Sequence, residues 1–367
     1  MKVLGIMSGT SLDGVDYCLS DISINNKYNF NFNIIDSKTY SYTEKLKNDL
    51  NNIIFNNSNN LHKCNDRIGK FYKETCLDFL KLKNIDLIAL HGQTISHKDK
   101  KYSTQIGNPF YLKSALNVPI YYDFRSNDIA NGGSGAPLMP FLDWLLFKNI
   151  QNKITISLNI GGISNLSIIK SNSKKSDIKG FDIGPGMTLI DKFVKSSWRL
   201  DYDFNGRIAQ KGNINSSIVD YISKNDLVLN SSKKVSLSTE QYSWNFVDKI
   251  NNKFINESKY DILRSIVSYT AKHIIKVIKP IIKESKNSSV QLLISGGGAK
   301  NYCLINEIKN KLKNIDVKKL NYRGLNIDNK EAFLMGVLGI SSYLKINNNI
   351  PSVTGANKNL ICGKLYE

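Results

Sequence analysis

The sequence predicts an α/β fold built from two similar halves. Apolar runs of strand length alternate with amphipathic stretches of helix length along the whole chain. The first run, Val3–Met7, enters a turn of small residues and is followed by a second apolar run. The same order returns about 150 residues later, where Ile154–Ile160 leads into Gly161-Gly162-Ile163-Ser164-Asn165. We therefore expect a duplication, and a coincidence between two glycine-containing hairpins is the alternative.

Each expected element follows from local pattern and from stop and start residues. Pro119 stands just before a strand, and Pro137 stands near the start of a helix, where proline is tolerated. The expected strands are Val3–Met7, Tyr17–Ile24, Phe30–Ser37, Ile85–His91, Ile120–Phe124, Ile154–Ile160, Leu166–Lys170, Gly180–Ile183 and Gln291–Ser295. The expected helices are Thr43–Phe55, Asp66–Lys81, Pro109–Ala115, Ala136–Phe147, Met187–Ser197, Asp261–Ser285 and Glu331–Leu344.

Charge and composition exclude several classes of protein. The net charge is +19, but only six of the 50 basic residues are arginine and the lysines are spread along the chain. Proteins that bind nucleic acid place arginine and aromatic residues together in patches, so we expect no nucleic-acid partner. No apolar run is long enough to cross a bilayer, and the first residues do not resemble a signal peptide. The five cysteines form no C-x-x-C pair, which favours a reducing cytoplasm.

The turn after the first strand is the most informative motif. Its residues are Ser8, Gly9, Thr10, Ser11, Leu12, Asp13, Gly14, Val15 and Asp16. Backbone N–H groups and hydroxyls crowded into such a turn form a cradle for phosphate oxygens, and glycine permits close approach. Asp13 would repel a phosphate, so it suggests a magnesium ion or its water shell. An ordinary hairpin turn is the alternative.

A third glycine-rich turn, Gly296-Gly297-Gly298, follows a strand and precedes a helix. Such a turn lets backbone pack flat against a nucleoside or a phosphate.

Asp182 is the carboxylate best placed for chemistry. It lies at the end of a short strand, and Gly184-Pro185-Gly186 forces a turn before the next helix. A carboxylate held on such a rigid element can take a proton from a nucleophile. The alternative is that Asp182 only organises the turn.

Three further polar positions each allow two interpretations. His91 follows a buried-looking strand, and it either faces a ligand or is a hydrogen-bonded structural residue. Asp123 either contributes to a site or pairs with Arg125. Glu331 begins a helix, where a carboxylate is favoured whether or not it binds anything.

The ordered set of motifs resembles the anhydro-N-acetylmuramic acid kinase family over nearly the whole chain. The motifs are Gly5–Asp16, His91-Gly-Gln-Thr94, Asp123-Phe-Arg125, Gly132–Leu138, Leu158–Asn165, Gly180–Gly186, Ser295–Asn301, Glu331-Ala332 and Pro351–Ala356. The resemblance implies a two-domain actin-like ATPase fold, a duplicated ribonuclease H-like arrangement with an interdomain cleft. It places the first domain at residues 1–128 plus 335–367 and the second at 129–334.

The resemblance also implies a reaction and its residues. Water would open the 1,6-anhydro bridge of anhydro-N-acetylmuramic acid, and O6 would accept the γ-phosphoryl group of ATP, with Mg2+ on the phosphates. Asp182 matches the catalytic base, and residues 9–16 match the ATP-binding segment. Gly161 and Gly162 would approach the terminal phosphates, and Gly296 and Gly297 the nucleoside. His91, Asp123 and Glu331 are candidate sugar-binding residues; the metal ligands stay unassigned, and the resemblance is compatible with a homodimer.

Two residues depart from the family pattern near the expected sugar side. Met187 stands where the family usually has asparagine, and Ser134 stands where a larger polar residue is usual. Lost polar contacts there would weaken sugar binding by roughly a kcal/mol each. Two alternatives to the leading hypothesis are an actin-like kinase of a plain hexose and a nucleotide-switched assembly or chaperone-type protein.

Overall fold

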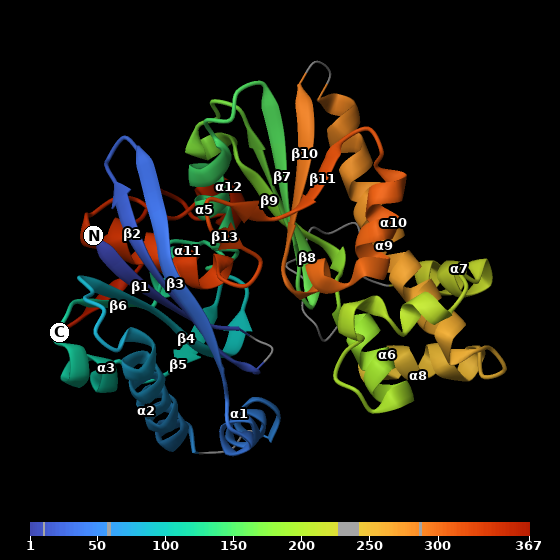
Figure 1. Cartoon of the computed structure of the whole chain (residues 1–367), viewed down its shortest axis with the longest axis horizontal. Helices are drawn as coiled ribbons and strands as arrows, with labels where there is room; N and C mark the ends of the chain where they lie inside the picture. Colours follow the sequence, from blue (N-terminus) through green and yellow to red (C-terminus); the bar gives the residue numbers. More distant parts are fainter. Residues whose placement is uncertain (10–11, 57–59, 227–241, 286–287) are drawn as a thin grey trace. The chain divides into compact units, whose positions relative to one another are not determined.

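One strand order occurs twice, in two sheets that belong to separate units of the chain (Figure 1). The computed structural model describes residues 1–9, 12–56, 60–226, 242–285 and 288–367. The first unit comprises Met1–Leu146, Lys174–Ile178 and Asn321–Glu367. The second comprises Phe147–Ser173 and Lys179–Leu320.

The sheet of the first unit has the order β14-β6-β4-β1-β2-β3, with β5 added to β4. β1 pairs antiparallel with β2 and parallel with β4, and β4 pairs parallel with β6. The strands are β1 (Lys2–Ser8), β2 (Gly14–Ile24), β3 (Phe30–Ser41), β4 (Leu87–Lys98), β5 (Tyr102–Ile106), β6 (Ile120–Tyr122) and β14 (Lys364–Tyr366). A separate hairpin is formed by β12 (Asn321–Tyr322) and β13 (Leu325–Asn326).

The sheet of the second unit has the order β11-β10-β7-β8-β9. β7 pairs antiparallel with β8 and parallel with β10, and β10 pairs parallel with β11. The strands are β7 (Lys153–Ile160), β8 (Ile163–Lys170), β9 (Lys179–Pro185), β10 (Ser289–Ser295) and β11 (Asp316–Lys319). Strands β7, β8, β9, β10 and β11 therefore repeat the pairing of β1, β2, β3, β4 and β6. This repeat confirms the duplication that the two glycine-containing hairpins predicted.

Helices pack on the sheets of both units. The first unit contains α1 (Glu44–Asn56), α2 (Leu61–Leu80), α3 (Phe110–Leu116), α4 (Ser126–Ala130), α11 (Lys330–Tyr343) and α12 (Pro351–Thr354), and α5 (Met139–Phe147) ends at its boundary. The second contains α6 (Thr188–Trp198), α7 (Ser216–Asn225), α8 (Trp244–Lys253), α9 (Lys259–Glu284) and α10 (Tyr302–Lys311). None of the helices in the described ranges combines the length and apolarity needed to cross a membrane.

Short 3-10 turns complete the two units. They are η1 (Lys175–Asp177), η2 (Phe204–Gly206), η3 (Ala209–Lys211) and η5 (Gly297–Lys300).

The first sheet is covered on both faces because its central strands alternate their side chains. Leu4 and Ile6 of β1 join the apolar core that includes residues of α1 and α2. Gly5 faces α11 instead, and a Cβ at Gly5 would lie 1.8 Å from the carbonyl oxygen of Ala332. Helix α11 can therefore approach β1 only because residue 5 has no side chain.

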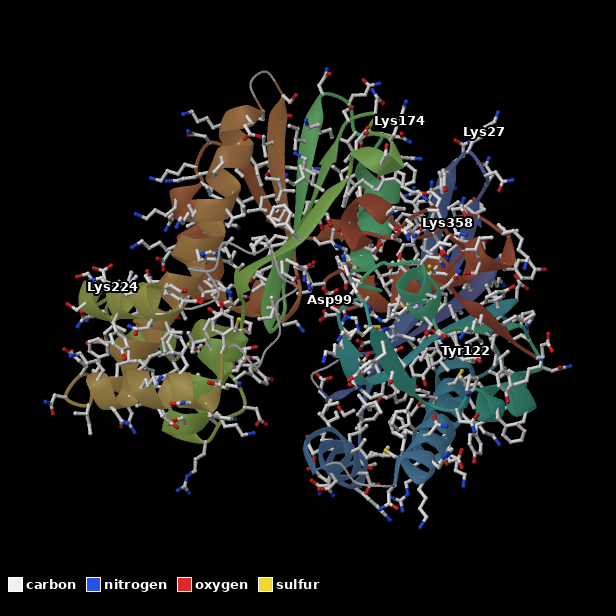
Figure 2. All side chains as sticks on the ribbon, turned by 180° about the vertical axis from the view of Figure 1, so that it is seen from behind. Lys27, Asp99, Tyr122, Lys174, Lys224 and Lys358 are labelled. Carbon is white, nitrogen blue, oxygen red and sulfur yellow. The ribbon has the colours of Figure 1, made fainter. Side chains whose placement is uncertain are left out.

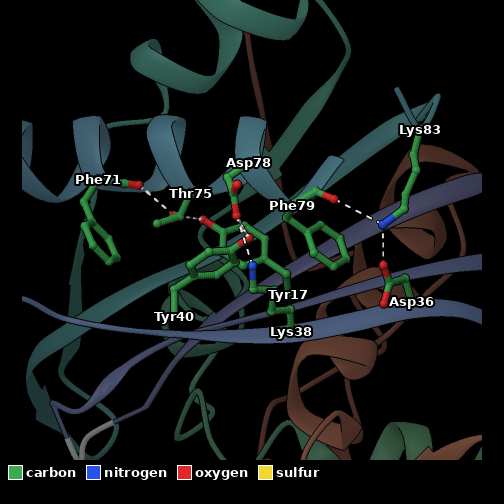
Figure 3. Close-up of polar contacts among 9 residues, drawn as sticks. All are labelled: Tyr17, Asp36, Lys38, Tyr40, Phe71, Thr75, Asp78, Phe79 and Lys83. Atoms are coloured by element: carbon green, nitrogen blue, oxygen red, sulfur yellow. Dashed lines mark hydrogen bonds and ion pairs between the residues drawn. The ribbon is translucent and has the colours of Figure 1, made fainter. Parts of the chain in front are cut away.

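Helix α2 is also fixed to strands β2 and β3 by polar contacts (Figure 3). The Tyr17 hydroxyl lies 2.8 Å from Thr75 Oγ1 and donates to the Tyr72 carbonyl oxygen at 3.1 Å. Lys38 forms an ion pair with Asp78 at 3.0 Å, and Tyr40 donates its hydroxyl to the same carboxylate. These contacts fix α2 along the outer strands of the sheet.

Lysines lie at the surface of both units. Figure 2 labels Lys27, Lys174 and Lys358 of the first unit and Lys224 of the second, and all four are exposed. The basic residues are thus not confined to one unit, as their spread along the sequence predicted.

The unit boundaries differ from those expected for the two domains. Residues 129–146, 174–178 and 321–334 belong to the first unit, whereas they were expected in the second domain. The reason is packing, because α11 lies against β1, β2 and β4. An ion pair of 2.7 Å between buried Lys330 and buried Asp143 also joins α11 to α5.

Gly5→Ala tests the contact between β1 and α11. We expect a loss of about 2 kcal/mol in the free energy of unfolding, because the new methyl group must displace backbone rather than a flexible side chain. Urea unfolding of the variant and the wild type measures this loss. Gly297→Ala is the matched control, since a Cβ there meets no heavy atom within 4 Å. Equal midpoints for Gly5→Ala and Gly297→Ala would show that the close approach is not a constraint.

Candidate active site

The turn after β1 is held at both ends by buried polar side chains. The Tyr42 hydroxyl lies 2.9 Å from Ser8 Oγ and 3.2 Å from Gln93 Oε1. Gln93 donates through Nε2 to the Gly9 carbonyl oxygen at 2.9 Å, and the Tyr42 N–H donates to the Asp13 carbonyl oxygen at 2.9 Å. Burial raises the pKa of Tyr42 to about 12, so its hydroxyl keeps its proton. The turn is thus held in place before any ligand arrives.

Four of the predicted nucleotide-binding residues of this turn are Thr10, Ser11, Gly14 and Val15. Thr10 and Ser11 lie outside the described residues. The Val15 side chain is fully buried, so only its backbone can meet a ligand. Gly14 is required by strand packing, because a Cβ there would lie 2.2 Å from the Tyr40 carbonyl oxygen. Strand packing therefore requires glycine at residue 14 whether or not a ligand approaches its backbone.

His91 and Arg125 form a hydrogen-bonded pair in the first unit. Arg125 donates to His91 Nε2 from Nη2 at 2.9 Å and from Nε at 3.2 Å, and Nη1 donates to the Gly135 carbonyl oxygen at 2.7 Å. His91 Nδ1 donates to the Gly92 carbonyl oxygen at 2.7 Å. Burial, together with the positive charge of Arg125, lowers the pKa of His91 to about 3. The ring is therefore neutral, and both of its nitrogens have partners.

The strand that carries His91 is longer than expected. β4 continues to Lys98 and pairs with β5 beyond Gln93, so the His91-Gly-Gln-Thr94 segment lies inside the strand. The segment nevertheless lies beside the end of the neighbouring strand, because Gln93 is the register partner of Ser8, the last residue of β1.

Glu331 belongs to a group of charged residues in the same unit. Burial raises the pKa of Glu331, and the negative charge of Asp16 raises it further, whereas Lys330 and Arg125 oppose the shift. Burial lowers the pKa of Arg125 to about 10, and Glu331 and Asp123 oppose that shift. Glu331 is thus close enough to both Asp16 and Arg125 to sense their charges.

Asp123 forms its ion pair with a residue other than Arg125. Lys364 lies 2.6 Å from Asp123 Oδ2, and the Ser126 N–H donates to Oδ1 at 3.0 Å. Burial raises the pKa of Asp123, but these two partners outweigh it and hold the pKa below its usual value. The pairing with Arg125 that the sequence left open is therefore not formed.

Asp128 organises the glycine-rich segment and was missed by the sequence analysis. Its buried carboxylate accepts the Gly135 N–H at 2.9 Å, the Thr354 hydroxyl at 2.9 Å and the Asn349 amide at 3.0 Å. The Gly135 carbonyl in turn accepts from Arg125. A single aspartate before a glycine-rich run gives no signal in sequence that separates this role from a solvent-exposed one.

In the second unit, Asp182 lies in a row of polar residues that crosses the sheet. Ser295 of β10 is the register partner of Asn159 on β7, Asn159 is the partner of Asn165 on β8, and Asn165 is the partner of Asp182 on β9. Register partners project from the same face of a sheet. The pairing of β8 with β9 shifts between Ser164 and Asn165, and such a bulge re-aims side chains. The row brings Asp182 onto one face with Asn159 and Ser295, which lie just before the turns at Gly161-Gly162 and Gly296-Gly297.

The glycines of the second unit serve different purposes. Gly186 is required by packing, because a Cβ would lie 2.1 Å from the Gly161 carbonyl oxygen. Gly296 is required as well, since its φ is +82° and a Cβ would lie 2.6 Å from Asn159 Oδ1. A Cβ at Gly161 would meet nothing closer than 3.5 Å, and one at Gly297 would meet nothing within 4 Å. These two positions leave bare backbone that a nucleotide could approach.

The turn between β7 and β8 also holds the start of α6. The N–H groups of Gly186 and Thr188 donate to the Gly162 carbonyl oxygen at 3.0 and 3.2 Å, and the Met187 N–H donates to the Gly161 carbonyl oxygen at 2.8 Å. The first amides of this helix are therefore used inside the protein. These bonds occupy the carbonyl oxygens of the turn and leave its own N–H groups unused by α6.

Asp191 is a second perturbed carboxyl on α6, and the sequence analysis gave it no role. Burial, with a contribution from Asp203, raises its pKa to about 7. Its Oδ1 atom makes no hydrogen bond within the part of the chain that the structure describes. A titration near pH 7 in an activity profile can therefore come from Asp191 as well as from a catalytic group.

The donor set fits a magnesium ion held mainly by a phosphate ligand. The described residues contain no group of three or more His, Cys, Asp or Glu side chains placed to hold a metal. Asp13 and Asp16 supply carboxylate oxygens near Glu331, where both raise its pKa. Magnesium keeps several waters and binds one or two carboxylates together with substrate phosphates, which matches this arrangement.

His91→Gln tests the neutral state of the buried ring. The folded pKa of about 3 lies below the unfolded value of about 6.5, so only the unfolded state gains a proton as pH falls below 6.5. Lowering the pH from 6.5 to 5 should therefore cost the wild type about 1.5 kcal/mol more unfolding free energy than the variant. Urea unfolding at several pH values measures both slopes, and parallel slopes would contradict the assignment.

Comparisons with known proteins agree along the whole length of the chain. The sequence model of the family described as anhydro-N-acetylmuramic acid kinase matches residues 1–367. The protein of that name from Francisella tularensis subsp. novicida (strain U112) is 35% identical, over 99% of this chain and 97% of its own length. The one from Clostridioides difficile (strain 630) is 33% identical, over 100% of this chain and 98% of its own length.

Solved structures resemble the chain more weakly. The activator of the 2-hydroxyisocaproyl-CoA dehydratase from Clostridium difficile with bound ADPNP is 14% identical, with a TM-score of 0.44, and covers 95% of this chain and 99% of that chain. The family assignment comes from the sequence matches alone. The chain belongs to the anhydro-N-acetylmuramic acid kinase family and is a phosphotransferase.

Proposed function

We propose that this chain opens the 1,6-anhydro bridge of anhydro-N-acetylmuramic acid with water and phosphorylates the freed O6 from ATP. Water forms a new bond to C1, the C1–O6 bond breaks, and O6 takes the γ-phosphoryl group. The products are N-acetylmuramic acid 6-phosphate and ADP. The observation that carries the proposal is the row in which Asp182 shares one sheet face with residues next to both glycine-containing turns.

Asp182 is the group we assign as general base. It lies inside β9, paired through β8 to the centre of the sheet, so its backbone is held on both sides of the row. A carboxylate fixed in this way can accept the proton of the attacking water within hydrogen-bond range. The proton leaves the water as the bond to C1 forms, and Asp182 holds it.

In the first unit we assign sugar binding to Glu331 and, through Arg125, to His91. Glu331 offers a carboxylate whose pKa is raised by burial and by Asp16, so it can accept hydrogen bonds from sugar hydroxyls or share a proton with them. His91 fixes the Arg125 guanidinium through its neutral Nε2. The contacts of Asp123 with Lys364 and Ser126 favour a structural role over direct sugar binding.

The nucleotide is assigned to the glycine-containing turns. Gly9 and Leu12 to Asp16 would meet the phosphates in the first unit, and Gly161 with Gly162 would meet them in the second. Gly297 offers bare backbone to the nucleoside, and Gly296 holds the shape of that turn. Asp13 and Asp16 would hold Mg2+, which neutralises charge on the phosphates when bound. We place the reaction in the cytoplasm, in the recycling of peptidoglycan amino sugar.

Asp182→Asn tests the assignment of the base. Purified protein with magnesium-ATP and 1,6-anhydro-N-acetylmuramic acid should release ADP only when the sugar is present. The variant should be slower by a factor of about 100 or more, because it cannot accept the proton, while its nucleotide affinity stays unchanged. A coupled ADP assay and a binding titration measure the two quantities.

Solvent oxygen separates the proposal from phosphorylation of a plain hexose. In water enriched in oxygen-18, ring opening places one labelled atom on C1, whereas transfer to an existing hydroxyl places none. Unlabelled product kept in the same water for the same time is the control. Sugar-dependent ADP release without label would contradict the ring-opening step, and release with no sugar dependence would contradict the proposed function.

A further inference from the structure

Asn159 lies where β7 approaches both glycine-containing turns of the second unit. It precedes Gly161 by two residues and is the register partner of Ser295, which precedes Gly296. Ser295 donates its hydroxyl to Asn159 Oδ1 at 3.3 Å. The same oxygen lies 2.6 Å from the Cβ position at Gly296. The carbonyl end of this carboxamide therefore points toward β10 and the turn that follows it.

The amide end of Asn159 points the other way. Nδ2 lies 3.7 Å from the Cβ position at Gly161, in the turn between β7 and β8. No hydrogen bond from this nitrogen to any described residue is present, and the side chain is only partly buried. The two N–H donors of Asn159 Nδ2 thus lie beside the backbone of Gly161, and the hydrogen bond from Ser295 to Oδ1 orients the carboxamide.

We propose that Asn159 donates from Nδ2 to an oxygen of the terminal phosphoryl group of the bound nucleotide. This inference rests on the proposed function for the identity of the ligand. The amides of Met187 and Thr188, at the start of α6, donate to the carbonyls of Gly161 and Gly162, so a ligand at this turn meets the N–H groups of the turn itself and the side chains beside it, of which Asn159 offers a donor. A neutral amide also suits an anion, since it supplies donors without a charge that must be paired.

The row separates the two proposed steps of the reaction. Phosphoryl transfer would occur near Asn159, and Asp182 would remove the proton of the water at the end of the row. Asp182 lies two strands away on β9, with Asn165 between them. Neighbouring strands are about 4.8 Å apart, so the two side chains leave the sheet roughly 10 Å apart. This spacing leaves room for a water molecule and a sugar between the base and the phosphoryl group.

Nucleotide binding without sugar tests the proposal directly. Calorimetry of the full chain compares ADP with a non-hydrolysable ATP analogue, both with magnesium. Asn159→Ala should weaken the analogue about 10-fold and Asn159→Asp about 100-fold, because a hydrogen bond to a charged group is lost and then replaced by repulsion. ADP affinity should change less than about 3-fold. A purely structural effect would not move the ratio of the two affinities.

Two further variants complete the design. Ser295→Ala removes the hydrogen bond that orients the Asn159 carboxamide, so it should lower the affinity for the ATP analogue about 3-fold and leave ADP affinity unchanged. This variant still tests the proposal if changes at residue 159 prevent folding. Asn172→Asp adds the same charge at an exposed turn of the same unit and should change neither affinity. An unchanged ratio in the Asn159 variants, or equal losses for both nucleotides, would overturn the proposal.

The outcome is separable from that of the proposed function. A wild type that binds the analogue through Asn159 yet phosphorylates no anhydro sugar leaves the inference intact and overturns the function. A wild type that binds neither nucleotide overturns both.

Discussion

The missing side chain at residue 5 is the constraint on which the first unit depends. Helix α11 can lie on β1 only while the Ala332 carbonyl oxygen occupies the space that a Cβ at Gly5 would take. The same contact sets the position of the helix along the strand, and Glu331, next to Ala332, senses the negative charges of Asp13 and Asp16 after β1. The absence of a Cβ at Gly5 therefore determines both the packing of α11 on β1 and the position of Glu331, which that helix carries.

The second unit repeats the strand order, but its first hairpin contacts a helix through hydrogen bonds. The carbonyl oxygens of Gly161 and Gly162 accept the amides at the start of α6. This arrangement ties the turn to the segment just after Asp182, so the two predicted motifs of this unit form one structure. It also uses the Met187 and Thr188 amides at the start of α6 inside the protein, whereas the backbone at Gly161 stays open.

Sequence pattern predicted the elements whose side chains face a core on regular spacing. β1, β7, α2 and α9 fall close to their expected ranges. Hydrogen-bond partners far apart in the chain show no regular spacing in sequence. One sequence therefore could not predict that Tyr42 contacts Gln93, or that Thr354 contacts Asp128. The polar row was out of reach for the same reason, because a single bulge near Asn165 decides which side chain meets Asp182.

The chemistry of the row explains why three of its four residues are neutral. Asp182 is the acidic member at one end of the row, with Asn165 next to it and Asn159 and Ser295 on the strands beyond. A second carboxylate beside Asp182 would raise its pKa, so a larger fraction of it would already carry a proton and could accept no other, and it would repel a phosphate brought to the same face. A lysine there would hold the phosphate but lower the pKa of the base. Neutral donors in the row can offer hydrogen bonds to an anion without adding a charge beside the carboxylate.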